Sequence, residues 1–307
     1  MSQITCVILT FNESLHIARA IENAKKVATR VIVVDSYSTD STIKISKELS
    51  VDVFQNKFIS QAQQFEWAMQ NCNIQSEWIL RLDADETFDS VLADNIKNFI
   101  LNQTTYNGAI FHRKHYFLNK WVKRGGRYPL PMLRLFRKGT AHIEQKWMDE
   151  HIVLDTGESK LLKGEFVDDN LNNVSWFVDK HNKYATREVI DIYIKKLLPE
   201  HNVSITEGTG IAIRAKRFLK NNIYMKLPLF LRPFLYFIFR YFIQLGFLDG
   251  YRGFAYHFLQ GFWYRVLVDI KYLEIAIEIE KVKAETVSDK LAVIESFTNY
   301  DLSEYKK

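Results

Sequence analysis

The sequence contains little cysteine, which excludes a fold held together by disulfides. Among 307 residues only Cys6 and Cys72 are cysteines. Cys6 lies inside an apolar, strand-like run, and Cys72 lies in a helix-like stretch. Disulfide-stabilised scaffolds are short and carry several regularly spaced cysteines. We therefore expect a chain that folds around its own hydrophobic core in a reducing cytosol.

Several motifs are also missing. The chain has no Gly-x-Gly-x-x-Gly segment and no Walker-type Gly-Lys-Ser/Thr loop, which argues against a dinucleotide oxidoreductase and a P-loop NTPase. It has no basic run, and a formal net charge of +5 is small for a nucleic-acid binder. The apolar run at residues 4–9 is shorter than a signal-peptide core. We expect no nucleic-acid partner and no export.

What is present is a pattern of strands that alternate with helices. With 47% hydrophobic residues, the chain can bury a full core and form one large domain with an appendage. Apolar runs separated by amphipathic stretches predict βαβ units and a parallel sheet. The predicted strands are residues 4–9, 31–34, 51–54 and 78–82, and the predicted helices between them are residues 14–28, 42–50 and 61–71.

Polar clusters follow three of these strands, at residues 10–13, 35–40 and 83–85. In open parallel sheets, ligands bind beyond the carboxyl ends of the strands. Asp83 and Asp85 stand two residues apart directly after an apolar run, so both carboxylates can approach one cation. Mg²⁺ and Mn²⁺ take one or two protein carboxylates and complete their shell with water and phosphates. The pattern therefore predicts a nucleoside diphosphate ligand.

The C-terminal third is rich in aromatic residues. Residues 227–248 carry Arg232 and Arg240 in a polar stripe on an otherwise apolar helix, and residues 254–270 form a second such stretch. Two internal arginines make a membrane span costly, whereas a narrow polar stripe is typical of a helix that lies in a membrane interface. We predict a helical hairpin that contacts a membrane. The alternative is a hairpin that packs on the catalytic domain or forms a dimer seam.

Taken together, these residues resemble the inverting family 2 glycosyltransferases of GT-A fold. The resemblance rests on residues 7–13, 33–40 and 82–86, which stand in that family's order and spacing. It implies a Rossmann-like α/β fold with a mixed, mostly parallel sheet flanked by helices, followed by an amphipathic helical hairpin. The implied domains are a catalytic domain at 1–200 and a helical, membrane-associating region at 201–307. Segments that further resemble the lipopolysaccharide-core β-glucosyltransferase branch are residues 134–137, 147–151, 168–170, 180–185 and 246–250.

The resemblance also implies roles for individual residues. Asp85 binds Mn²⁺ or Mg²⁺ directly and Asp83 lies near the metal or the ribose, with His151 either as a further metal ligand or hydrogen-bonded to the neighbouring acids. The catalytic base is Asp149 or Glu150. The family's usual Glu-Asp pair is reversed here, which leaves the choice between the two open. Arg124, Arg127 and Arg134 are candidates to bind the diphosphate or a phosphorylated acceptor. The residues implied to cradle the donor are Leu9, Thr10, Phe11, Glu13, Asp35, Asp83, Ala84 and Asp85.

The activity that follows is transfer of a hexose, glucose by the resemblance, from a UDP-sugar to a lipopolysaccharide-core or related surface-glycan acceptor, with a β-linkage as product. The partners are a UDP-sugar donor and a glycolipid or oligosaccharide acceptor, and the protein is expected in the cytoplasm, peripherally on the inner face of the cytoplasmic membrane. Two alternatives remain open. One is transfer to a polyprenyl phosphate, and the other is a sugar-nucleotide-binding protein without turnover.

Overall fold

The computed structural model describes residues 3–102, 105–145, 147, 150–199 and 224–305. The chain forms two compact units. The first comprises Met1–Asn172 and Tyr241–Phe254, and the second comprises Asn173–Arg240 and Ala255–Lys307. The domain boundary predicted at residue 200 adjoins residues 200–223, which lie outside the described residues, so that boundary stays a prediction.

The strands all belong to the first unit. They are β1 (Ile4–Thr10), β2 (Arg30–Asp35), β3 (Asp52–Gln55), β4 (Trp78–Asp83), β5 (Glu86–Phe88), β6 (Gly108–Phe117), β7 (Lys120–Val122), β8 (Pro131–Arg137), β9 (Ala141–Ile143), β10 (Ile152–Leu154) and β11 (Ser159–Asp169).

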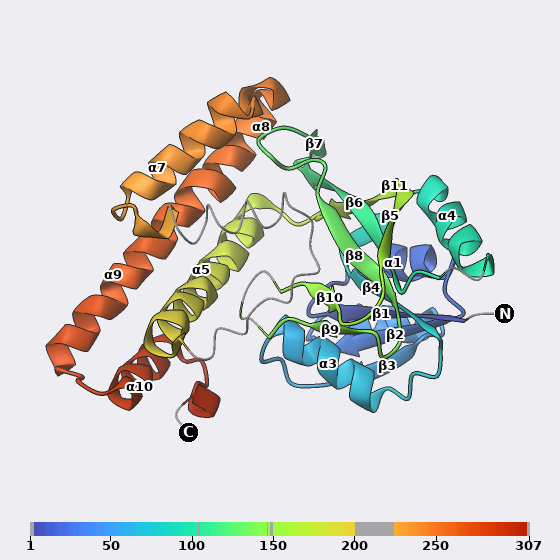
Figure 1. The fold of residues 1–307 in the computed structure, drawn as a ribbon, viewed down its shortest axis with the longest axis horizontal. Helices are drawn as coiled ribbons and strands as arrows, with labels where there is room; N and C mark the ends of the chain where they lie inside the picture. The colour runs from blue at the N-terminus through green and yellow to red at the C-terminus, as the bar shows by residue number, and fades with distance from the viewer. Residues whose placement is uncertain (1–2, 103–104, 146, 148–149, 200–223, 306–307) are drawn as a thin grey trace. The chain divides into compact units, whose positions relative to one another are not determined.

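Nine of these strands form one mixed sheet in the order β3-β2-β1-β4-β8-β6-β11-β5, with β7 paired to β6 (Figure 1). The strands β3, β2, β1 and β4 run parallel, and β8 pairs antiparallel with both β4 and β6. The strands β9 and β10 form a separate antiparallel pair.

Helices cover both faces of the parallel half of the sheet. They are α1 (Ile17–Ala24), α2 (Thr42–Glu48), α3 (Gln61–Asn71) and α4 (Ser90–Leu101). Cys6 and Ile8 of β1 pack in one core with α1 and α4, whereas Val7 and Leu9 pack in the other core with α3. A strand buried on both faces reads as a continuous apolar run, which is why the sequence predicts β1 so clearly. The predicted α/β class, with its flanking and C-terminal helices, is confirmed.

The segment 241–254 packs against the loop that joins β7 to β8. It contains the 3₁₀ turn η4 (Gly246–Asp249), and α8 (Gly250–Tyr256) begins there. Asp249 is buried and its Oδ2 accepts a hydrogen bond from the backbone N–H of Arg124 at 2.8 Å. The backbone N–H of Gly125 donates to the carbonyl of Gln244 at 3.0 Å. Polar groups of the segment therefore face the sheet domain.

The second unit is helical. The two arginines of the predicted polar stripe point into it, because Arg232 is buried with Asp269 (Nε to Oδ1, 2.8 Å) and buried Arg240 bonds to Gln260. None of the helices in the described part of the chain combines the length and the apolar character needed to span a bilayer. The elements are α5 (Val174–Leu197), η2 (Tyr224–Lys226), α7 (Leu231–Ile238), η5 (His257–Trp263), α9 (Tyr264–Val282), α10 (Val287–Thr298) and η6 (Ser303–Tyr305), and η3 (Phe239–Ile243) crosses from this unit to the first.

Candidate active site

The polar segments predicted after three strands meet at one edge of the sheet. Thr10, the last residue of β1, is in register with Asp35, the last residue of β2. Leu9 is in register with Asp83, the last residue of β4. Paired strands lie about 4.8 Å apart, so these strand ends are direct neighbours. This is the carboxyl edge at which an open parallel sheet binds its ligand.

Asp35 is fully buried at this edge and organises the loop that follows β2. Its carboxylate accepts hydrogen bonds from Thr10 Oγ1 (3.1 Å), the backbone N–H of Ser38 (2.9 Å) and Gln55 Nε2 (3.2 Å), and the Ser38 hydroxyl also donates to it. A carboxylate has about four acceptor positions. Protein donors thus already engage Asp35, and direct contact between Asp35 and a donor nucleoside stays a prediction.

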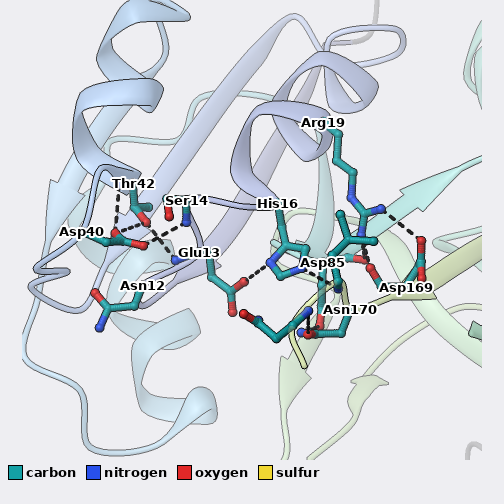
Figure 2. Close-up of polar contacts among 12 residues, drawn as sticks. Asn12, Glu13, Ser14, His16, Arg19, Asp40, Thr42, Asp85, Asp169 and Asn170 are labelled. Carbon is teal, nitrogen blue, oxygen red and sulfur yellow. Dashed lines mark hydrogen bonds and ion pairs between the residues drawn. The ribbon is translucent and has the colours of Figure 1, made fainter. Parts of the chain in front are cut away.

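Side chains of the two neighbouring loops bind each other's backbone. The backbone N–H of Asn12 donates to Ser38 Oγ at 2.8 Å. The backbone N–H of Ser14 donates to Asp40 Oδ2 at 3.0 Å, as Figure 2 shows. Asn12 itself has a left-handed backbone, with φ 55°. Burial raises the pKa of Asp40, but hydrogen bonds from Thr42 and Ser14 outweigh that effect and hold the pKa below its ordinary value. The result is a rigid pair of loops at the carboxyl edge.

Two aromatic side chains at this edge are exposed. Phe11, directly after β1, is 53% exposed, and Tyr37, two residues after β2, is 56% exposed. Exposed aromatic rings at a ligand-binding edge suit stacking against a planar base or a sugar. Sequence reasoning selected Phe11 but missed Tyr37, although its place in the polar loop after Asp35 was a signal.

Buried arginines connect the acids after β4. Arg134 of β8 bonds to Glu86 (Nη2 to Oε1, 2.5 Å) and lies 3.5 Å from Asp83 Oδ2. Arg81 of β4 bonds to Glu150 (Nη2 to Oε1, 3.0 Å) and lies 3.7 Å from Asp83 Oδ1. Asp83 therefore sits between two guanidinium groups. Burial raises the pKa of Glu86 to about 8, against the opposing charge of Arg134.

The structure describes two of the residues named in the sequence-based hypotheses on the diphosphate and the base. Arg134 was a candidate for a diphosphate ligand, but it is 3% exposed and engaged with Glu86. Glu150, a candidate base, reaches the acids at the end of β4 through Arg81. Asp149, the other candidate base, lies outside the described residues.

Asp85 is held by the end of β11. Asn170 Nδ2 donates to Asp85 Oδ2 at 2.9 Å, and the backbone N–H of Asp169 donates to the Asp85 carbonyl at 3.2 Å (Figure 2). Arg19 of α1 donates to the same carbonyl at 3.2 Å and pairs with Asp169 Oδ2 at 3.1 Å. Two separate segments, the end of β11 and α1, therefore fix the position of Asp85. Ala84, in the same turn, is buried.

His16 connects Glu13 to the same segment. It is fully buried, its Nδ1 lies 2.6 Å from Glu13 Oε2, and its Nε2 accepts the backbone N–H of Leu171 at 2.8 Å (Figure 2). An Nε2 that accepts a hydrogen bond carries no proton, so the proton is on Nδ1, which donates a hydrogen bond to Glu13. Sequence reasoning missed His16, Arg19 and Asn170 as residues that position the acids.

The predicted metal ligands are not gathered into a complete protein site. Among the residues that the structure describes, no group of three or more His, Cys, Asp or Glu side chains is placed to hold a metal ion. His151 contacts a different acid, Glu144 (Nδ1 to Oε2, 3.2 Å), and its role as a metal ligand stays a prediction. Asp83 and Asp85 still offer hard oxygen ligands at the strand end. Such a pair fits a cation that completes its shell with water and phosphate oxygens.

The sequence profile of the family described as "Glycosyl transferase family 2" matches residues 5–170, the sheet and the strand-end residues described above. The match covers more than half of the chain. This chain belongs to glycosyl transferase family 2. It is a glycosyltransferase by that membership, and curated glycosyltransferases are its relatives.

Curated proteins that this chain resembles carry general names. An uncharacterized glycosyltransferase of Rickettsia prowazekii is 28% identical over 202 residues, 62% of this chain and 68% of the relative. One of Rickettsia felis is 39% identical over 97 residues, 32% of this chain and 34% of the relative. Glycosyltransferase SunS of Bacillus subtilis is 35% identical over 92 residues, 28% of this chain and 20% of SunS. Apart from the first, these matches span about a third or less of each relative.

Among solved structures, Staphylococcus aureus TarS residues 1–349 in complex with UDP-GlcNAc is 13% identical, with a TM-score of 0.45 and 92% of both chains covered. Glucosyl-3-phosphoglycerate synthase of Mycobacterium tuberculosis, in complex with Mn²⁺, UDP and glucosyl-3-phosphoglycerate, is 15% identical, with a TM-score of 0.31. That match covers 38% of this chain and 44% of the other.

Proposed function

We propose that this family 2 glycosyltransferase is inverting and depends on a divalent metal. In this proposal it moves a hexose, glucose by the resemblance, from a UDP-sugar to a lipopolysaccharide-core or related surface glycan. The observation that carries the proposal is the register of Thr10 with Asp35 and of Leu9 with Asp83. It gathers the acids and the exposed aromatics at one sheet edge.

The donor would lie along this edge. Leu9, Thr10 and Glu13 form the floor of the cradle together with Asp35, whose bonded loop provides a fixed surface. Phe11 offers an exposed ring for stacking against the base, and Tyr37 offers a second. Because the loops are tied to each other by side chains, little conformational entropy is lost when the nucleoside binds.

The diphosphate would lie at Asp83 and Asp85. A divalent cation bound by these carboxylates would neutralise the charge that develops on the leaving diphosphate. The protein's own part is to hold the acids in place. Asn170 orients the Asp85 carboxylate, and the guanidinium groups of Arg81 and Arg134 flank Asp83.

Glu150 or Asp149 would accept the proton of the acceptor hydroxyl. A single displacement at the anomeric carbon needs a carboxylate on the face opposite the leaving group, and it inverts the configuration. Glu150 is supported by its contact with Arg81, which connects it to the strand-end acids. An α-linked donor would therefore yield a β-linked product. In this proposal the acceptor is membrane-borne, and the protein acts at the inner face of the cytoplasmic membrane.

The test is release of free UDP from a panel of UDP-sugars with Mn²⁺, Mg²⁺ or EDTA. We expect turnover of one donor, its loss with EDTA, its return when metal is added back, and its loss in Asp85→Ala. Asp94→Ala, an exposed aspartate of α4, is the matched control and should keep wild-type activity. Calorimetry with UDP should show metal-dependent binding. No UDP release together with no nucleotide binding would refute the proposal.

A further inference from the structure

The segment 241–254 reverses the usual arrangement of soluble proteins, in which apolar side chains face the protein and polar groups face solvent. Its polar groups face the protein, because Asp249 is buried and Gln244 bonds to the loop between β7 and β8. Its large apolar side chains face solvent and are 42–78% exposed. Single exposed apolar residues need no explanation, but a contiguous group of them marks an interaction surface. This apolar face consists of Phe242, Ile243, Leu245, Leu248, Tyr251 and Phe254.

The neighbouring hairpin of β6 and β7 carries positive charge beside the apolar face. Arg252 Nη1 donates to the carbonyl of Leu118 at 3.2 Å, so α8 lies beside the turn that joins β6 to β7 (Figure 1). Leu118 is itself 44% exposed. Lys120, Lys123 and Arg124 are exposed along this hairpin and its loop. The only acid within residues 118–130 and 241–254 is Asp249, which is buried.

We propose that this apolar face and its basic rim form the surface by which the protein binds an anionic lipid bilayer. The inference rests on the proposed function in one respect, since a membrane-borne acceptor gives the contact its purpose. Apolar side chains would enter the interface between head groups and acyl chains, while lysine and arginine side chains pair with anionic head groups.

A second copy of the chain suits this face less well. In a two-fold dimer the same face meets itself, so the two basic rims would be brought together without an acid to balance them. Like charges in opposition disfavour such an interface. A bilayer carrying anionic lipid supplies the missing negative charge.

The test uses the full chain and two kinds of vesicle, phosphatidylcholine alone and phosphatidylcholine mixed with phosphatidylglycerol. We expect the protein to float with the anionic vesicles, less with the neutral ones, and less at high salt. The triple variant Ile243→Ser, Leu248→Ser and Tyr251→Ser should bind the anionic vesicles at least about ten-fold more weakly. The double variant Lys120→Gln and Lys123→Gln should bind the anionic vesicles more weakly and the neutral vesicles as the wild type does.

The control removes three exposed apolar side chains elsewhere in the same unit, with Val91→Ser, Leu101→Ser and Leu161→Ser, and should bind like the wild type. Donor hydrolysis should stay unchanged in every variant, so a failed donor assay and a failed membrane assay remain distinguishable. Equal flotation of the triple variant and the wild type would overturn the inference. The inference would also be overturned if the wild type bound neither kind of vesicle but formed a dimer, and the triple variant were monomeric.

Discussion

Glu150 is the residue at which the proposed chemistry can be tested most directly. Its carboxylate accepts a hydrogen bond from buried Arg81 at 3.0 Å. In Glu150→Gln the amide oxygen can still accept that bond, so the fold should persist, but the side chain can no longer take a proton. We expect kcat to fall about 10²- to 10⁴-fold with donor affinity unchanged, as measured by UDP release and calorimetry.

Glu144→Gln is the matched control, because Glu144 is a buried acid nearby in the chain that contacts His151 instead. It should change kcat little. Full activity in Glu150→Gln would count against Glu150 as the base. It would leave two explanations, Asp149 as the base or a polyprenyl phosphate acceptor that is already ionised.

Asn170 should control metal affinity through Asp85. Its amide donates to Asp85 Oδ2 at 2.9 Å, and partners of metal ligands typically change metal affinity about 10- to 100-fold when removed. Asn170→Ala should therefore need a higher Mn²⁺ or Mg²⁺ concentration for half-maximal UDP release, with activity recovered at saturating metal. Asn172→Ala should behave as the wild type, since Asn172 contributes its backbone N–H to this network. An unchanged metal titration in Asn170→Ala would refute this role.

Among the elements, β11 packs so closely on α4 that one glycine is required. Gly164 has φ +94°, and a Cβ there would lie 2.4 Å from the backbone nitrogen of Leu92. Gly139 has a similar φ of +81° with open space around it, so Gly139→Ala measures backbone strain alone. We expect a loss of about 1 kcal/mol for Gly139→Ala and about 3 kcal/mol or more for Gly164→Ala, by urea denaturation. Equal losses would show that the clash is relieved by movement of α4.

The loop between β2 and α2 should depend on the ionisation of Asp40. Hydrogen bonds from Ser14 and Thr42 lower its pKa, so the folded chain favours the carboxylate. The hydrogen bonds to the Asp40 carboxylate stabilise the folded chain fully above the ordinary carboxyl pKa near 4. This stabilisation is lost as the pH falls through the lower pKa that Asp40 has in the folded chain. Because solvent screens this exposed carboxylate, Asp40→Asn should lose only about 0.5 kcal/mol at pH 7, and the gap to the wild type should narrow at pH 3.

Thermal unfolding at both pH values measures this effect. Asp94→Asn, an exposed aspartate of α4, is the reference for a general charge effect. A gap that stays constant between pH 7 and pH 3 would contradict the assigned role.

Elements with a local signature were predictable from the sequence, and elements that depend on distant partners were not. β1 is a continuous apolar run, and α3 begins with a Ser60 cap that accepts from the backbone of Gln63. β11 carries charged residues and glycine, and only its pairing with β6 and β5 makes it a strand. For the same reason the sequence located the strand-end acids, whereas the pairing of Arg134 with Glu86 and the contacts of His16 and Asn170 require the assembled sheet.

At the scale of the whole molecule, the first unit includes the distant segment 241–254, which completes hydrogen bonds of the loop between β7 and β8. The backbone N–H groups of Arg124 and Gly125 donate to Asp249 and Gln244, which a fragment ending at the predicted boundary, 1–200, would lack. Hydrogen exchange at these two amides should accelerate at least about ten-fold in the fragment relative to the full chain, because local opening then breaks no contact with that segment.

The amides of Ser38 and Thr39 provide the internal reference for that experiment. They donate to Asp35 and Asn12, which the fragment retains, so their exchange should be the same in both chains if the sheet is folded. Faster exchange at all four amides would mean that the fragment does not fold, and that the catalytic domain needs residues beyond 200 for its stability. Unchanged exchange at Arg124 and Gly125 would show that the loop is held without the segment 241–254. The apolar face would then be an appendage of the catalytic unit instead of a part of its structure.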